Sequence, residues 1–132
     1  MFVYGTLLDP ALRRRLLPHR PGRLAPARLL GHRRVGVTAR PWPTIVADAT
    51  AGAAVEGLLW SGLTATDVAR LDAYEGDAFE RGVVTVRRLA AHADATRAAA
   101  AHADCEQVLA WAWRLRADAR DRPSDLPWSP PT

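Results

Sequence analysis

The sequence predicts an α+β domain in which short strands alternate with two helices. Three observations lead to this prediction: apolar, β-prone runs recur along the chain, two segments combine helical periodicity with capping residues, and glycine or proline separates them. The chain has 132 residues, which is enough to bury one core. We therefore expect one domain over residues 1–120 and a proline-rich tail over residues 121–132.

The N-terminal segment predicts a buried strand followed by a glycine turn and a helix. Residues 1–4 are apolar and β-prone, and Gly5 directly follows them. Asp9 is a favoured N-cap and Pro10 is favoured at the first helical position, so we expect a helix over residues 11–17.

The next part of the chain predicts strands interrupted by prolines. Residues 27–38 are expected to form one strand or two short strands. Residues 40–43 contain two prolines, which lack amide donors, so irregular structure is expected there. Brief strands are expected over residues 44–47 and 54–60, the second one buried on both faces because its polar alternation is poor.

The clearest helix lies at the middle of the chain. Thr64 or Thr66 is the expected cap, the apolar spacing leads to Glu75, and Gly76 is suited to end the helix. Further strands are expected over residues 83–89 and 108–115, with Trp111 and Trp113 on one face of the second, and the alanine-rich stretch 90–104 lies between them.

Composition and charge exclude several functional classes. All eighteen basic residues are arginine, so lysine Schiff-base chemistry is excluded, and the arginine-rich composition is typical of a GC-rich, bacterial genome. No apolar run approaches the ~20 residues that span a bilayer, and we expect a cytoplasmic protein without a membrane partner.

The basic residues are concentrated in the first third of the chain. Residues 1–40 hold nine arginines and one acid, a net charge of +8, whereas the net charge of the whole chain is +4. Residues 5–40 contain no Trp, Tyr or Phe that could stack on bases. We therefore expect a solvated arginine face and no nucleic-acid partner.

Two features near residue 100 could suggest a reactive site. Cys105 is the single cysteine and lies in alanine-rich surroundings, so we interpret it as inert. His92 and Asp94 repeat as His102 and Asp104, a pairing that could bind a metal. Because alanines surround both pairs, we interpret the segment as a linker, and we expect neither a metal nor a cofactor.

Glu75 stands out among the four glutamates by its position at the end of an amphipathic helix. Leu71 and Tyr74 are apolar neighbours that could raise the pKa of its carboxyl group. Two plainer interpretations remain open: a solvated acid at the helix end, or an ion-pair partner of Arg81. The glycine turn after residues 1–4 could present backbone N–H groups to the same ligand.

Several segments in order resemble the gamma-glutamylcyclotransferase-like family, also called AIG2-like. The similarity runs from Phe2 to about Val86 and continues weakly to Trp113. It is carried by Phe2–Leu7, Val55–Gly57, Leu71–Gly76, Phe79–Arg81 and Val83–Val86.

The resemblance implies a small mixed β-barrel of about six strands with flanking helices. It also implies an enzyme that cyclises a small gamma-glutamyl amide to 5-oxoproline and releases an amine or amino acid. Glu75 would be the general acid and base. The substrate would be bound by Tyr4, Gly5, Thr6, Leu7, Trp42, Arg81 and Trp113.

The alternative is a non-catalytic small-molecule binding domain on the same fold. Trp113 stands where the family usually has a tyrosine, and an indole can donate but cannot accept a hydrogen bond. Neither the leaving amine nor the oligomeric state is indicated by the sequence. Trp128 in the tail could dock onto another subunit or onto its own domain.

Overall fold

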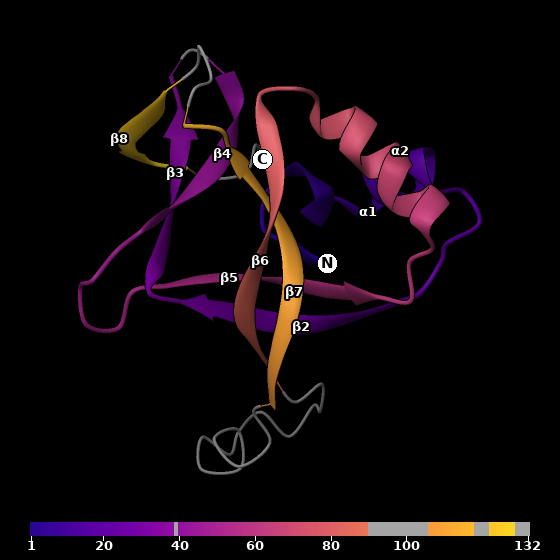
Figure 1. Ribbon diagram of the computed structural model, residues 1–132, viewed down its shortest axis with the longest axis horizontal. Helices are drawn as coiled ribbons and strands as arrows, with labels where there is room; N and C mark the ends of the chain where they lie inside the picture. Colours follow the sequence, from indigo (N-terminus) through magenta and orange to yellow (C-terminus); the bar gives the residue numbers. More distant parts are fainter. Residues whose placement is uncertain (39, 90–105, 118–121, 129–132) are drawn as a thin grey trace.

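The computed structural model describes residues 1–38, 40–89, 106–117 and 122–128 (Figure 1). The expectations for Cys105, for the two His-x-Asp pairs and for the alanine-rich stretch lie outside these residues. The described elements are, in chain order, β1 (Phe2–Val3), a 3-10 turn (Thr6–Leu8), α1 (Pro10–Leu16), β2 (Arg23–Leu30), β3 (His32–Val37), β4 (Arg40–Ala47), β5 (Ala54–Ser61), α2 (Ala65–Glu75), β6 (Phe79–Arg88), β7 (Glu106–Leu115) and β8 (Pro123–Pro127).

The strands form two antiparallel sheets. One sheet has the order β1-β5-β2-β6-β7 and the other has the order β4-β3-β8. β2 pairs with β5 along its whole length, as β6 does with β7, whereas β2 meets β6 only at Ala27 and Arg28. The β6–β7 ribbon therefore crosses the β2–β5 ribbon, and α2 lies beside the crossing (Figure 1).

The α+β class is confirmed, but the prediction of a barrel is wrong because the sheets do not close. Between β4 and β7 the structure has one side-chain bond, in which the Leu115 N–H donates to Thr44 Oγ1 at 3.0 Å. β4 also carries Pro41 and Pro43, which have no amide to contribute to a ladder. A single hydrogen bond thus stands where barrel closure would require a row of backbone bonds.

The prediction of irregular structure at residues 40–43 is also wrong. These residues begin β4, which is an edge strand paired only with β3 among the described strands, through a register shift at Gly36 and Val37. Proline is tolerated at such edges because one side of the strand makes no ladder bonds. The backbone can therefore extend through both prolines.

The proline-rich tail contributes a strand to the second sheet. β8 pairs with β3. The indole N–H of Trp128 then donates to the Pro41 carbonyl at 3.0 Å, and Arg34 lies 5.6 Å from the centre of the same ring. Of the two expected docking surfaces, Trp128 uses its own domain.

The expectation that β5 is buried on both faces is wrong. Glu56, within β5, is exposed and pairs with Arg28.

The helix limits agree with the capping signals. The Asp9 side chain accepts from the Ala11 N–H at 2.9 Å, and Pro10 is the first residue of α1. In α2, Thr64 and Asp67 form a reciprocal capping box, with bonds of 3.0 and 3.1 Å. Gly76 ends α2 with a φ of 81°, a conformation that glycine adopts without strain.

Packing of α2 determines where Glu75 lies. Leu71 is fully buried in one of the two apolar clusters, and Glu75 follows it by four residues on the same helix face. The burial of Leu71 therefore directs Glu75 toward β1 and β7. The other buried members of this cluster are Val3, Leu7, Leu12, Leu17, Trp60, Phe79 and Trp113. No described helix is long and apolar enough to cross a membrane.

Candidate active site

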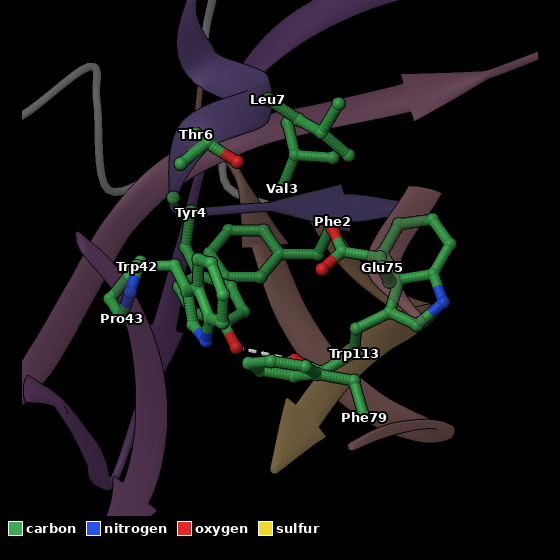
Figure 2. A pocket seen from close by; sticks show the side chains of 11 residues that line it. Phe2, Val3, Tyr4, Thr6, Leu7, Trp42, Pro43, Glu75, Phe79 and Trp113 are labelled. Carbon is green, nitrogen blue, oxygen red and sulfur yellow. Dashed lines mark hydrogen bonds between the residues drawn. The ribbon is translucent and has the colours of Figure 1, made fainter. Parts of the chain in front are cut away.

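A small cavity of about 30 Å³ lies where α2, β1, β4 and β7 meet. Figure 2 shows its side chains, among which the aromatic rings predominate. The cavity is lined by Phe2, Val3, Tyr4, Gly5, Thr6, Leu7, Trp42, Pro43, Glu75, Phe79 and Trp113. Of the eight residues predicted from the sequence, this set includes all except Arg81.

Glu75 is the only carboxylate among the described lining residues, and its environment favours the protonated form. Burial raises the pKa of Glu75 to about 7, with a further contribution from the charge of Asp72. No described residue donates a hydrogen bond to this carboxylate. A carboxyl with this pKa is close to half-ionised at neutral pH, so it can both accept and return a proton.

Both plainer interpretations of Glu75 differ from the structure. Its side chain is substantially buried, so it is not a solvated acid. Arg81 pairs with Asp72 instead, through Nε bonds of 3.0 and 3.2 Å to the two carboxylate oxygens. The guanidinium of Arg81 also lies 4.8 Å from the centre of the Trp111 ring, which places it outside the cavity.

Asp72 also determines what Trp113 can do. The Trp113 indole N–H donates to Asp72 Oδ1 at 2.6 Å, so the ring lines the cavity while its donor is already engaged. Asp72 was not among the site residues predicted from the sequence. The signal was its position three residues before Glu75, a spacing that places two acids on one helix face.

The turn that follows β1 lines the cavity and contains backbone amides that have no partner within the turn. Its first internal bonds run from the Leu8 N–H to the Gly5 carbonyl at 2.9 Å and from the Asp9 N–H to the Thr6 carbonyl at 3.1 Å. The amides of Thr6 and Leu7 precede these bonds and have no acceptor within the turn. They are donors that a ligand in the cavity could use.

Two arginines hold the carbonyl groups of this segment. Arg34 Nη1 donates to the Tyr4 carbonyl and Arg13 Nη1 to the Leu7 carbonyl, each at 2.7 Å. In a trans peptide the C=O and the following N–H point in opposite directions. The Gly5 N–H is therefore directed away from Arg34.

Close packing explains the glycine in this turn. A Cβ atom on Gly5 would lie 2.8 Å from Cγ of Pro43. A side chain at position 5 would therefore collide with this proline ring. On the other side of the turn, Thr6 Oγ1 and the Tyr74 hydroxyl are 3.0 Å apart, which joins the turn to the end of α2.

The Tyr4 hydroxyl has a hydrogen-bond partner, whereas the Trp42 indole N–H has none among the described residues. The buried Tyr4 hydroxyl donates to the Trp113 carbonyl, and burial raises the pKa of Tyr4, so the phenol stays protonated. The Trp42 indole N–H is buried and lacks a hydrogen-bond partner, the one such side-chain atom in the described part of the chain. Because Trp42 lines the cavity, this N–H is a donor available to a ligand.

Among the described residues, no group of three or more His, Cys, Asp or Glu side chains is arranged to hold a metal ion. The site described above therefore consists of one carboxyl group of nearly neutral pKa, a turn with available amides, and one available indole donor.

Comparison with known proteins identifies the family. A family model described as gamma-glutamyl cyclotransferase, AIG2-like, matches residues 1–129. The chain belongs to this family. The resemblance drawn from Phe2–Leu7 and Leu71–Gly76 is thereby confirmed.

AIG2-like relatives from Arabidopsis thaliana show both sequence and fold similarity. Protein AIG2 C is 33% identical over 89 residues, which make up 67% of this chain and 52% of that protein, so this chain spans about half of its length. Two Arabidopsis proteins solved in solution have similar folds. One has a TM-score of 0.67 at 27% identity, covering 89% of this chain and 68% of that one. The other has a TM-score of 0.61 at 28% identity, covering 85% and 59%.

Proposed function

We propose that this AIG2-like chain cyclises a small gamma-glutamyl amide to 5-oxoproline and releases an amine or amino acid. The observation that carries the proposal is the partly buried Glu75 carboxyl, whose pKa is raised to about 7, on a cavity lined by the Gly5–Leu7 turn. Family membership supplies the reaction class. No cofactor is part of the proposed reaction.

Proton transfer is the part of this reaction that Glu75 would catalyse. The α-ammonium of the substrate must lose a proton before its nitrogen can attack the γ-carbonyl carbon and form the five-membered ring. The bond to the leaving nitrogen then breaks. In total the attacking nitrogen loses two protons, and the leaving nitrogen gains two and departs as an ammonium. A carboxyl with a pKa near neutrality suits both transfers.

The remaining donors would bind the oxygen atoms of the substrate. The amides of Thr6 and Leu7 are suited to a carboxylate or to the oxyanion that develops on the γ-carbonyl. The unpartnered Trp42 N–H is suited to the same task from the neighbouring strand β4. Because the reaction is intramolecular, holding the substrate in a folded conformation would itself lower the barrier.

Arg81 is not given a substrate-binding role in this proposal. Its guanidinium is engaged by Asp72 and Trp111. Trp113 would contribute an apolar wall, since Asp72 holds its indole N–H. Tyr4 would contribute its backbone and the packing of its ring, because its hydroxyl is engaged by the Trp113 carbonyl.

A second candidate function is non-catalytic binding of a small molecule in the same cavity. One observation favours it: the Trp113 indole N–H is already engaged by Asp72, so it cannot assist a reaction. A cavity of about 30 Å³ holds only about two water-sized spheres, which limits both functions equally. A gamma-glutamyl substrate would require the cavity to widen. We expect the wall formed by Trp42 and Pro43 to yield, because it belongs to an edge strand.

The test is release of 5-oxoproline from a panel of gamma-glutamyl amino acids and amines. Wild type and Glu75→Gln are assayed side by side, with Glu80→Gln as a control at an exposed glutamate. Product from wild type and from the control, but not from Glu75→Gln, supports the proposal. Saturable ligand binding without product would favour the second function, and full turnover by Glu75→Gln would refute the role of Glu75.

A further inference from the structure

A second and larger cavity lies beside α1. It is a groove of about 230 Å³ between α1, the start of β2 and the end of β5. None of its lining residues borders the Glu75 cavity. The lining residues are Pro10, Arg13, Arg14, Leu17, Arg20, Pro21, Gly22, Leu24 and Trp60, and we call this the α1 groove.

The polar side chains of the α1 groove are all cationic. Arg13, Arg14 and Arg20 line it, and its described lining includes no acidic residue. The two nearby acids are already engaged: Asp9 caps α1, and Asp67 bonds to His19 at 2.8 Å and to the start of α2. The charge of Asp9 still acts on Arg13, but no described carboxylate forms an ion pair with Arg14 or Arg20.

Two of the three guanidinium groups are available to a ligand. Within the described part of the chain, the side chains of Arg14 and Arg20 make no hydrogen bond or ion pair. Arg13 differs, since it donates to the carbonyls of Leu7 and Leu8 at 2.7 and 2.9 Å. Burial lowers the pKa of Arg13, the charge of Asp9 opposes this shift, and the charge of Arg14 adds a smaller lowering. Arg14 and Arg20 are therefore the two cations that we assign to a ligand.

The floor of the α1 groove is apolar. Leu17 and Trp60 are almost fully buried, whereas Leu24 remains 43% exposed. The Trp60 indole N–H donates to the Pro21 carbonyl at 2.9 Å, so the small part of the ring that reaches the groove is carbon surface, and Leu24 supplies most of the exposed apolar area. A bound molecule would therefore bury an apolar body below an anionic group.

The rim that carries Arg20 is held rigidly. Arg20 has a φ of 51°, a left-handed conformation that costs a non-glycine residue roughly 1–2 kcal/mol. Its N–H donates to the Leu17 carbonyl at 3.0 Å. Two residues later, a Cβ atom on Gly22 would lie 1.9 Å from the Ser61 carbonyl oxygen, so the backbone is pressed against β5. Strained positions that persist under such constraint often belong to ligand sites.

We propose that the α1 groove binds a small organic anion, with its carboxylate or phosphate on Arg14 and Arg20 and its apolar body on Leu17, Leu24 and Trp60. Arginine pairs with either oxyanion through parallel N–H donors. The groove is distinct from the Glu75 cavity, so this proposal does not depend on the reaction proposed there. Arg13 joins the two sites, because it contacts the groove and also the carbonyl of Leu7.

Calorimetric titration of the whole chain tests this proposal. The probes are octanoate, octyl phosphate, inorganic phosphate and octanol. We expect at least one of the two amphipathic anions to bind, and both octanol and inorganic phosphate to bind at least tenfold more weakly. Comparison of octanoate with octyl phosphate identifies the preferred anion.

Variants locate the binding. Arg14→Gln/Arg20→Gln is expected to weaken the binding of the anion by about tenfold or more. The matched control Arg15→Gln/Arg23→Gln removes the same charge from exposed positions outside the groove and should bind as wild type does. Glu75→Gln should also retain binding, which separates this site from the cavity.

Several results would overturn the proposal. They are no heat with either amphipathic anion, equal affinity for octanol or inorganic phosphate, or equal weakening in the two double variants. Circular dichroism of each variant shows whether it is folded. If the groove double variant does not fold, Arg20→Gln alone takes its place, with Arg23→Gln as its control, and the same outcomes apply.

Discussion

Replacing Glu75 with glutamine is expected to stabilise the folded chain at alkaline pH. The folded-state pKa of Glu75 is about 7, above the value of 4.5 for an unperturbed carboxyl. Between these two values the folded chain binds more protons than the unfolded chain does. Its stability therefore falls as the pH rises from 4.5 to 7, and the loss is complete above 7.

The magnitude follows from the two pKa values. At about 1.4 kcal/mol for each pH unit between them, the ionised carboxylate costs the folded state about 3 kcal/mol at pH 8. The carboxyl is not completely enclosed, so this figure is an upper limit. Glutamine resembles the protonated acid in shape and carries no charge, and it removes this cost. Below pH 4.5 both forms are neutral, and the two proteins should be nearly equally stable.

Urea denaturation at pH 4, 6 and 8 measures this difference directly. We expect the free energy of unfolding of Glu75→Gln to exceed that of wild type increasingly from pH 4 to pH 8. Glu80→Gln, at an exposed position, should follow wild type throughout. A constant difference between Glu75→Gln and wild type, or a loss of stability at pH 8, would refute the argument that Glu75 is destabilised by burial.

Three further predictions test the surroundings of Glu75. Gly5→Ala places a Cβ 2.8 Å from Pro43 and should lower the free energy of unfolding by about 1–3 kcal/mol in urea, whereas unchanged stability would mean that the proline moves freely. Asp72→Asn removes a negative charge near Glu75 and should lower the pKa of Glu75, which carboxyl 13C NMR measures. An unchanged pKa would contradict a contribution of the Asp72 charge to the pKa of Glu75. Thr64→Ala removes the cap of α2 and should cost about 1 kcal/mol in thermal unfolding while the Glu75 titration stays the same; a shifted titration would show that the cap also positions Glu75.

Local signals in the sequence identified the helices and the position of Glu75. Asp9 with Pro10, and Thr64 with Gly76, define helix ends because caps act through bonds between residues close in sequence. The glycine turn and the helix-end acid could be recognised together because their order resembled a family. Their meeting at one cavity depends on the burial of Leu71, which periodicity also indicated.

Long-range features could not be obtained in this way. Whether β4 joins β7 by a ladder depends on which strand edges meet, and no local pattern encodes this. Arg81 could have paired with Asp72 or with Glu75, and the structure pairs it with Asp72. The Trp113 indole N–H likewise donates to Asp72 and not to Glu75. The orphan N–H of Trp42 follows only from the absence of an acceptor nearby, which requires the packed structure.

The pH dependence of kcat/KM for 5-oxoproline formation tests whether Glu75 is the acid–base group. If Glu75 accepts the proton from the substrate, kcat/KM should rise with pH and reach half of its plateau near pH 7. This is the pKa of Glu75 in the enzyme without bound substrate. A rise centred near pH 4.5, or the same profile in Glu75→Gln, would contradict the assignment of Glu75 as the acid–base group.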